Sequence, residues 1–298
     1  MKKLIPIVSL FLFASLYSVA SEIGDRTIPA DVAQLSDSLK RQYAPDKRVA
    51  LFDVDYSFSG KNVMLRGVTT SAEAKAALLN GLSKADYQVM DCLQVLPDEA
   101  ALEGKTYGII NVSVSNLRVD PDFSSEMMTQ GLMGMPVRVL QRDGWYRIQT
   151  PDNYIAWVHR VGIHPVTKEE LHVWNRAEKI VVTSHYGFVY SEPNQSSQTV
   201  SDVVAGNRLK WEGTKGAFYK VAYPDGRTGY ISKSISMPEK KWRAALKQDA
   251  ASIIRTAHTL MGVPYLWAGT SSKGIDCSGF IFSFMISSFP EMLHSKRM

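Results

Sequence analysis

Near the C-terminal end of the sequence, a cysteine lies in a setting that favours nucleophilic chemistry. Cys277 follows Asp276 and precedes Ser278 and Gly279, and apolar residues after them continue a helical pattern. Asp is a residue type that caps helices, so Cys277 is expected in a first helical turn, where backbone N–H groups favour the thiolate. Gly279 lets a substrate or another backbone segment approach closely. The residues alone leave two interpretations open: an activated thiol at a cleft, or a buried cysteine on an apolar helix.

The elements before Cys277 predict how it is presented. Residues 239–262 have the spacing of one long helix, because their apolar residues fall on a single face. Gly262 and Pro264 end this helix. A Gly-rich stretch then leads to the cysteine and is suited to holding it at the rim of a cleft.

Two stretches of short strands lie upstream and share one pattern. Residues 105–165 and 179–235 each run in the order strand, Pro-containing loop, Gly before a strand, aromatic strand, Pro-Asp turn and a strand containing Tyr-Ile. This repetition indicates an internal duplication of roughly 70 residues, and short strands at this spacing favour small barrels. Residues 168–176 predict a helical connector between the copies.

Residues 21–100 predict a small α/β unit in which no catalytic grouping or metal-ligand spacing is visible. Ser71 is the expected N-cap of its second helix. Cys92 falls in its last strand, where a buried structural thiol is the expected role. Since Cys92 and Cys277 are the only cysteines, a disulfide scaffold is excluded, and a single bridge between them stays open. The predicted helices and strands cover residues 30–43, 48–56, 63–68, 71–82 and 87–95.

The stretch from Pro264 to Phe280 resembles the nucleophile motif of the NlpC-type cell-wall cysteine peptidases, in which a P-Y-x-W-G-G-like segment precedes D-C-S-G. Ala268 stands where that family often has Gly. The two β-rich stretches resemble bacterial SH3-like domains. The fold class that follows is a multidomain α+β protein with a small α/β N-terminal unit, two SH3-like β-barrels and an incomplete papain-like peptidase domain. The predicted parts are a signal peptide (1–20), the N-terminal unit (21–100), SH3-like domains (101–165 and 166–238, the second with the helical connector) and the first part of the peptidase domain (239–298).

The resemblance also implies an activity. Secreted enzymes of this kind hydrolyse the bond between γ-D-glutamate and the diamino acid of peptidoglycan stem peptides. No cofactor is expected for this sequence. Cys277 would attack the scissile carbonyl and form an acyl-enzyme. Tyr265 would stabilise the oxyanion or line the site. Trp267 is expected to pack rather than to react.

The same resemblance implies a set of substrate-binding residues. In such enzymes an SH3-like domain restricts the site to stem peptides with a free N-terminal L-Ala. Glu126 and Tyr154 occupy the matching positions of the first SH3-like domain, and a carboxylate facing an ammonium suits such a site. The alternatives are a solvated loop acid for Glu126 and a barrel aromatic for Tyr154. Asp276 and Ser278 complete the expected set around the amino end.

A cysteine peptidase also needs a base for the thiol proton, which in this family is a histidine on a strand well downstream. His294 is the only histidine after Cys277, and no strand pattern surrounds it. We therefore expect that His294 is not the base, that the sequence is a truncated or frame-altered version of a longer enzyme, and that its own activity is very low. The competing hypotheses are a non-catalytic cell-wall-binding protein and, disfavoured by the lack of a C-x-x-C pair, an exported redox protein.

The N-terminus and the composition predict where the protein works. Lys2 and Lys3 precede an apolar run from Leu4 to Leu16, and Ser18-Val19-Ala20 supplies a cleavage site, so export to the periplasm or cell envelope is expected. The run is too short to span a membrane, and no stable membrane anchor is expected. The 298 residues are 45% hydrophobic with a net charge of +5, and no basic cluster marks a nucleic-acid face. Peptidoglycan stem peptides are the expected partners, no metal site is expected, and the oligomeric state stays open.

Overall fold

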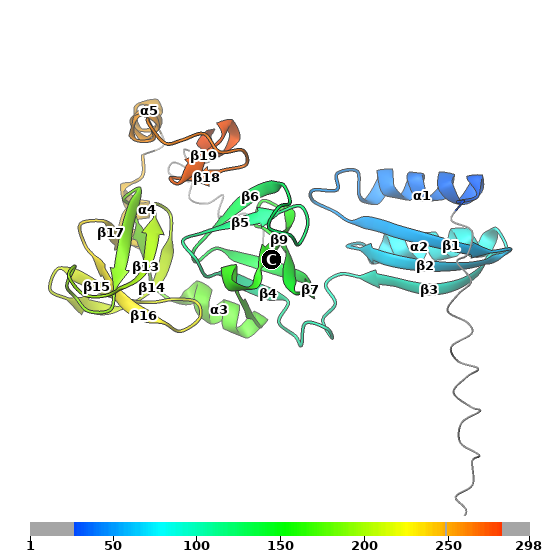
Figure 1. Ribbon diagram of the computed structural model, residues 1–298, viewed down its shortest axis with the longest axis horizontal. Helices are drawn as coiled ribbons and strands as arrows, with labels where there is room; N and C mark the ends of the chain where they lie inside the picture. The colour runs from blue at the N-terminus through cyan, green and yellow to red at the C-terminus, as the bar shows by residue number, and fades with distance from the viewer. Residues whose placement is uncertain (1–26, 248, 282–298) are drawn as a thin grey trace, which may run out of the picture. The chain divides into compact units, whose positions relative to one another are not determined.

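The computed structural model describes residues 27–247 and 249–281, and the chain divides into two compact units (Figure 1). The first unit holds residues up to Pro45 and Ala50–Val95, and the second holds Asp46–Val49 and the residues from Leu96 onward. The predicted signal peptide and His294 lie outside the described residues. None of the helices formed by the described residues has the length and apolarity that a membrane crossing requires.

The first unit is a three-stranded sheet with two helices packed on one face. The strands run in the order β1-β2-β3, with β1 antiparallel and β3 parallel to β2. Ser71 caps the second helix by accepting a hydrogen bond from the Ala74 N–H at 3.0 Å, as predicted. Leu65, Leu78 and Leu82 are fully buried in the core between the helices and the sheet. The elements are α1 (Ala30–Tyr43), β1 (Phe52–Ser59), β2 (Asn62–Thr69), α2 (Ala72–Lys84) and β3 (Gln88–Val95).

The prediction that Cys92 is a buried structural thiol is wrong. Cys92 is an exposed free thiol on β3, whereas the next residue, Leu93, is buried. Successive side chains of a strand point to opposite faces, and in this unit only one face of the sheet is covered by helices. The apolar run around Cys92 does not reveal which of its residues face the helices.

The second unit contains two β-rich repeats with the same strand order. In the first repeat, Tyr107–Val166, the strands lie in the order β10-β4-β7-β8-β9-β5-β6. In the second repeat, Lys179–Pro238, the equivalent strands lie in the same order, β17-β11-β14-β15-β16-β12-β13. The strands of the first repeat are β4 (Tyr107–Ile110), β5 (Val114–Arg118), β6 (Met127–Leu132), β7 (Pro136–Asp143), β8 (Trp145–Gln149), β9 (Ile155–His159) and β10 (Ile163–Val166), with the 3-10 turn η1 (Arg160–Gly162) before β10. Those of the second are β11 (Lys179–Val182), β12 (Tyr186–Tyr190), β13 (Thr199–Val204), β14 (Arg208–Lys215), β15 (Phe218–Ala222), β16 (Thr228–Ser232) and β17 (Ser236–Pro238).

Backbone details confirm the internal duplication. The β7/β8 pair has a bulge between Val139 and Gln141, and the β14/β15 pair has one between Trp211 and Gly213. The β5/β6 and β12/β13 pairs also each carry a register shift at the same place. β-bulges are specific local features, so their recurrence at matching places shows that the two repeats share one backbone plan.

The two repeats form one block. Met133, between β6 and β7, is buried in the core of the second repeat, and its carbonyl accepts a hydrogen bond from the Arg208 N–H at 3.0 Å. The fully buried Asn207 donates through Nδ2 to the carbonyl of Ser113 at 2.8 Å. The predicted connector is α3 (Lys168–Arg176), which begins with a capping box made by Thr167 and Glu170.

Four strands escape the sequence pattern: β6, β10, β13 and β17. β6 reads Met-Met-Thr-Gln-Gly-Leu, so a buried Gln130 and a Gly interrupt the apolar alternation that predicts strands. β10 and β17 pair with β4 and β11, which are distant in sequence, whereas β6 and β13 pair with the strand directly before them, β5 and β12.

The single helix predicted over residues 239–262 is also wrong. The chain forms α4 (Glu239–Ala245) and α5 (Ala250–Thr259) instead, and Leu246 between them is extended. Asp249 explains the break, because its side chain caps α5 by accepting from the Ser252 N–H at 2.7 Å. No residue of α4 or α5 is buried, so within residues 27–247 and 249–281 no core covers the apolar face that suggested one helix. A two-stranded hairpin follows, made of β18 (Thr270–Ser271) and β19 (Gly274–Ile275).

Candidate active site around Cys277

Asp276 begins the helical turn that carries Cys277. Residues 277–281 are helical, and Asp276 Oδ1 accepts hydrogen bonds from the Gly279 N–H at 2.6 Å and from the Ser278 hydroxyl at 2.8 Å. The Phe280 N–H donates to the carbonyl of Asp276 at 2.9 Å and closes the first turn. The predicted cap is therefore present, with Cys277 directly after it.

The environment of Asp276 favours its charged form. The side chain is buried, which opposes ionisation, but hydrogen bonds from Gly279, Ser278 and the Ala268 N–H outweigh this effect and lower the pKa of Asp276 below its ordinary value. The Ala268 N–H reaches Oδ2 at 3.0 Å. An ionised Asp276 thus fixes both the helix start and the loop that precedes it.

The loop before Cys277 is joined to the hairpin through its backbone. The Leu266 N–H donates to the carbonyl of Ile275, and the Ile275 N–H donates to the carbonyl of Pro264, both at 3.1 Å. Gly279 packs so closely that a Cβ there would lie 2.1 Å from the carbonyl oxygen of Gly269. The prediction that Gly279 permits a close backbone approach is confirmed, and the neighbour it admits is this loop.

Ala268 occupies a backbone conformation that favours glycine. Its φ is +59°, in the left-handed region where a Cβ is strained. Glycine at the equivalent position of the resembling family has a physical reason, since glycine adopts this conformation without steric cost. The alanine therefore keeps the loop geometry at some cost in stability.

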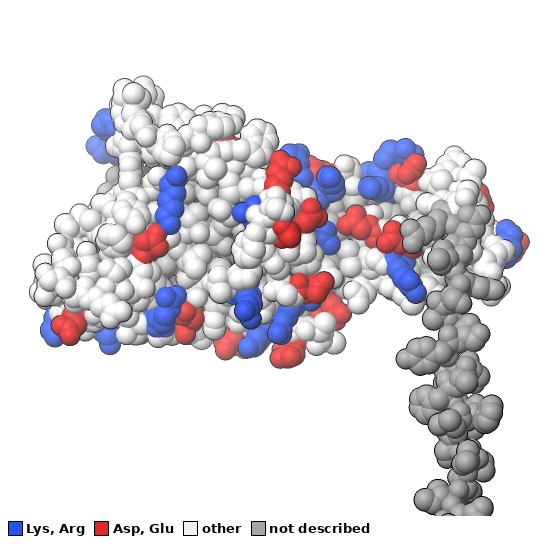
Figure 2. Space-filling view, in the orientation of Figure 1, with Lys and Arg blue, Asp and Glu red and all other residues white. Residues whose placement is uncertain are grey.

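Cys277 is exposed and its thiol is free, so the interpretation of a buried core cysteine is wrong. Ser278 beside it is exposed too. Tyr265 and Trp267 are 68% and 62% exposed, and the surface over β18 and β19 is largely uncharged in Figure 2. The thiol and the two aromatic side chains that precede it in the chain are thus all accessible at the surface.

Glu126 contacts the loop that leads to Cys277. It lies directly before β6, and its Oε1 accepts a hydrogen bond from the Trp267 indole N–H at 3.1 Å. The Glu126 side chain is exposed, so it keeps capacity for a further donor. The first repeat therefore brings a carboxylate beside the aromatic segment that precedes the cysteine.

Tyr154 has a different neighbourhood. It lies in the turn between β8 and β9, half-buried, with its carbonyl accepting from the Thr150 N–H at 2.9 Å. The Tyr154 side chain interacts electrostatically with Arg48. Within the described residues, Glu126 and not Tyr154 forms a hydrogen bond with the loop before Cys277.

Sequence reasoning missed a second link between the first repeat and this loop. The buried Gln130 of β6 accepts from the Thr270 N–H through Oε1 at 2.9 Å and donates through Nε2 to Asn116 at 3.0 Å. A buried glutamine needs partners for its polar atoms, so its position in an apolar strand was the one available signal. The partner itself, far along the chain, could not be inferred from the pattern.

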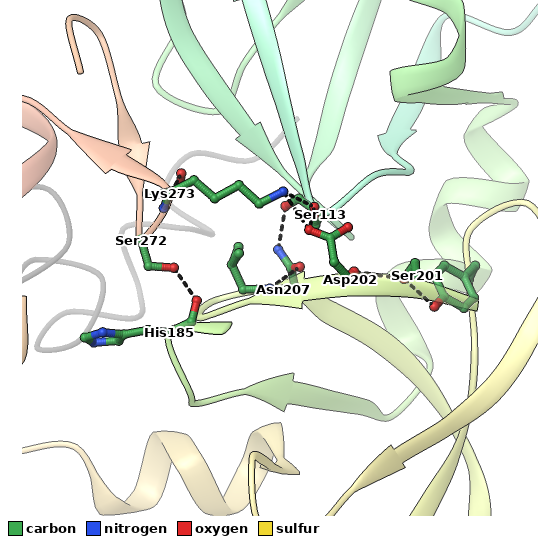
Figure 3. A network of polar contacts seen from close by, with 10 residues as sticks. Ser113, His185, Ser201, Asp202, Asn207, Ser272 and Lys273 are labelled. Carbon is green, nitrogen blue, oxygen red and sulfur yellow. Dashed lines mark hydrogen bonds and ion pairs between the residues drawn. The ribbon is translucent and has the colours of Figure 1, made fainter. Parts of the chain in front are cut away.

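The second repeat also contacts the hairpin (Figure 3). Lys273 forms an ion pair with Asp202 at 2.6 Å, and the Ser272 hydroxyl donates to the carbonyl of His185. Both hairpin residues lie in the turn between β18 and β19. Among the described residues, no three His, Cys, Asp or Glu side chains gather closely enough to hold a metal ion.

Comparison with known families identifies both repeats. Residues 117–162 match the bacterial dipeptidyl-peptidase SH3 domain, and residues 185–236 match the bacterial SH3 domain. The two SH3-like domains predicted from the sequence are thereby confirmed.

Two curated proteins that resemble this chain are named as dipeptidyl-peptidases. A γ-D-glutamyl-L-lysine dipeptidyl-peptidase of Bacillus cereus is 26% identical over 166 residues, covering 53% of this chain and 49% of the relative. Dipeptidyl-peptidase 6 of Lysinibacillus sphaericus is 25% identical over 182 residues, covering 57% of this chain and 65% of the relative. This chain thus spans about half the length of the first relative and less than two thirds of the length of the second.

A solved structure agrees with the fold. The crystal structure of an NlpC/P60 family protein from Bacillus cereus aligns with a TM-score of 0.51 at 23% identity, covering 61% of this chain and 72% of that chain. The resemblance to NlpC-type peptidases with SH3-like domains, noted from the residues around Cys277, is confirmed by these relatives.

Proposed function

We propose that this chain, which carries two bacterial SH3 domains and is related to dipeptidyl-peptidases, acts on peptidoglycan stem peptides through the thiol of Cys277. One observation carries the proposal. An exposed cysteine directly follows a helix cap, and the loop held by that cap also contacts a carboxylate of the first SH3 domain. Nucleophile and substrate-binding charge thus belong to one connected set of contacts.

The chemistry proposed for Cys277 is acyl transfer. The thiolate adds to the carbonyl of γ-D-glutamate, the bond to the diamino-acid nitrogen breaks, and the amine leaves with a proton. Water then hydrolyses the thioester and regenerates the thiol. Backbone N–H groups at the start of the helix favour the anion, and the exposed Tyr265 is available to line the site or donate to the oxyanion.

Glu126 is the proposed partner of the free amino end of the substrate. One of its oxygens accepts from Trp267, and the exposed carboxylate has lone pairs left for an ammonium. Asp276 accepts two bonds at Oδ1 and one at Oδ2, which leaves Oδ2 with capacity for one more. Ser278, and Tyr154 at the β8–β9 turn, complete the proposed recognition set.

The bond cleaved and the place of action are further parts of the proposal. The names of the relatives point to γ-D-glutamyl bonds, and such bonds occur in wall fragments outside the cytoplasm, in line with the export signal read from the sequence. The thiol proton needs an acceptor. Among the described residues no histidine follows Cys277, so an added external base is expected to raise the rate of cleavage.

The test is hydrolysis of L-Ala-γ-D-Glu-diaminopimelate by the purified chain, with the L-lysine analogue and an N-acetylated analogue alongside. Cleavage is expected that is lost in Cys277→Ala, kept in Cys92→Ala and weak toward the acetylated peptide. Added imidazole, which can act as an external base, is expected to accelerate it. Cleavage that persists in Cys277→Ala would refute the nucleophile.

The alternative is a non-catalytic wall-binding protein. The two SH3 domains with their shared core are the observation that favours it. Retention of the chain on purified peptidoglycan, with no cleavage even in the presence of imidazole, would support this alternative over the enzyme.

A further inference from the structure

Equivalent positions of the two repeats hold the same hairpin. Gln130 of β6 pairs across the strand with Asn116, and Asp202 of β13 pairs with Phe188 at the corresponding place in the second repeat. Gln130 binds the Thr270 N–H at the start of the hairpin, and Asp202 binds Lys273 in its turn. The duplication therefore supplies two side chains, one from each repeat, to one short element.

A second pair of equivalent positions does the same. Ser113 directly precedes β5, and His185 directly precedes β12. The Ser113 hydroxyl accepts from Lys273 Nζ at 3.0 Å, and the His185 carbonyl accepts from the Ser272 hydroxyl. Both repeats thus contact the β18–β19 hairpin at the same edge of their sheets, the first repeat through β5 and β6 and the second through β12 and β13.

Lys273 is the residue at which these contacts converge (Figure 3). Its ammonium lies 2.6 Å from Asp202 Oδ2 and 3.0 Å from Ser113 Oγ, while the Ser113 hydroxyl donates to the same carboxylate oxygen at 2.8 Å. Asn207 of the second repeat extends the network by donating through Nδ2 to the Ser113 carbonyl. One side chain therefore ties the hairpin to both repeats at once.

We propose that Lys273 is a positioning residue that, together with Asp202 and Ser113, locks the β18–β19 hairpin to both SH3 domains and thereby sets the position of Cys277. The hairpin connects directly to the site. Asp276 follows β19, and its N–H donates to the Gly269 carbonyl at 3.0 Å, just before β18. A shift of the hairpin therefore moves the cap of the helical turn that carries the thiol.

The contact is suited to positioning rather than to holding the fold together. Lys273 and Asp202 side chains are 41% and 30% exposed, and ion pairs of this exposure contribute little to global stability. The cores of both repeats are built from other residues. Removal of the pair is therefore expected to leave the protein folded.

The experiment measures the reactivity of Cys277 against an internal reference. Iodoacetamide alkylation of the intact chain is followed by peptide mass mapping, and the rate at Cys277 is divided by the rate at the exposed Cys92 of the first unit. Lys273→Met and Asp202→Asn are each expected to lower this ratio several-fold. The exchanged pair Lys273→Asp with Asp202→Lys is expected to restore most of it, because it rebuilds the ion pair with reversed charges.

Lys220→Met is the matched control. Lys220 belongs to the second repeat and pairs with Glu212 at 3.6 Å, with similar exposure, so its removal is expected to leave the ratio unchanged. A ratio in Lys273→Met that equals or exceeds that of the unsubstituted chain, or an exchanged pair that restores nothing, would overturn the proposal.

This inference rests on the proposed function only for its catalytic consequence. In hydrolysis of the stem peptide, Lys273→Met is expected to lower kcat about tenfold while KM stays near its original value, since Glu126 is untouched. If the unsubstituted chain hydrolyses no peptide, the proposed function fails, and the alkylation ratio still decides whether Lys273 positions Cys277.

Discussion

Equivalent loops of the two SH3 domains make the same backbone hydrogen bonds but end in different side chains. Residues 119–126 lie between β5 and β6, and residues 191–198 lie between β12 and β13. In the first loop the Ser124 N–H donates to the Asp122 side chain, and in the second the Ser196 N–H donates to the Asn194 side chain. The Val119 N–H binds the carbonyl of the last loop residue, and the Ser191 N–H does the same.

At the end of this loop, the first domain has Glu126 and the second has Gln198. Only the side-chain charge distinguishes these two positions in an otherwise matching backbone. The first domain thus presents an anion next to Trp267, whereas the second offers a neutral amide at the equivalent place. The fold is common to both copies, but the SH3-domain carboxylate proposed to bind the ammonium belongs to only one of them.

Among the predictions, the largest effect is expected on kcat/KM when the charge difference between Glu126 and Gln198 is removed. Glu126→Gln makes the first loop equal to the second and removes the charge that faces the substrate ammonium. Since hydrogen bonds to charged groups are worth about 1.5–3 kcal/mol, kcat/KM for the free-amine peptide should fall about 10- to 100-fold. Steady-state kinetics measures this change, and the reciprocal Gln198→Glu is expected to leave it unaltered. An equal loss in both variants would contradict the assignment of Glu126.

The two domains also differ at the first residue of their first strand, which is Tyr107 in the first domain and Lys179 in the second. The buried amine of Lys179 makes the stability of the protein depend on pH. Burial lowers the pKa of Lys179 to about 8, against 10.5 for the free side chain. Between these values the unfolded chain binds more protons than the folded one, so the free energy of unfolding should rise with pH, by about 2 kcal/mol from pH 8 to pH 10. Urea unfolding at several pH values measures the rise.

Lys179→Met provides the control for this rise. The substitution removes the titrating group, so the rise between pH 8 and pH 10 should be lost. Burial raises the pKa of Tyr223 to about 12, which reduces stability above pH 10 in both proteins and so cancels in the comparison. A slope that survives in Lys179→Met would show that another group titrates.

Local signals predicted much of the backbone. The helices of the first unit, the Ser71 and Asp276 caps and the duplication depend on residues close in sequence, and these predictions are confirmed. The helix over residues 239–262 and the buried Cys92 failed because apolar spacing does not say whether a core covers it. A pattern of apolar residues predicts burial only where another element packs against it.

The candidate site divides in the same way. Asp276, Cys277 and Gly279 act through neighbours a few residues away or through one close backbone contact, so the sequence motif contains most of their geometry. Gln130 and Lys273 act through partners on other strands, and nothing in the local sequence indicates which strands meet. Such long-range pairs become visible only when the sheet order is known.

Gln130 allows a test of the first domain's hold on the hairpin. Gln130→Leu keeps an apolar strand but leaves the Thr270 N–H and Asn116 without their partner. The loss of these hydrogen bonds should reduce the free energy of local opening by about 1 kcal/mol. Hydrogen exchange of the Thr270 amide should accelerate accordingly, whereas Gln198→Leu, at an exposed site of the second domain, should not change it.

The smallest expected effect concerns the loop that both domains help to hold. Ala268 has a φ of +59°, and replacing it by glycine relieves the strain of its Cβ while giving the unfolded chain more freedom. The net gain in the free energy of unfolding should be about 0.5 kcal/mol, measured by urea titration. Ala257→Gly, inside α5, should instead destabilise, because glycine is unfavourable within helices. If both substitutions destabilise equally, the left-handed geometry at residue 268 does not hold in solution, and the loop that links Asp276 to the first domain must take another form.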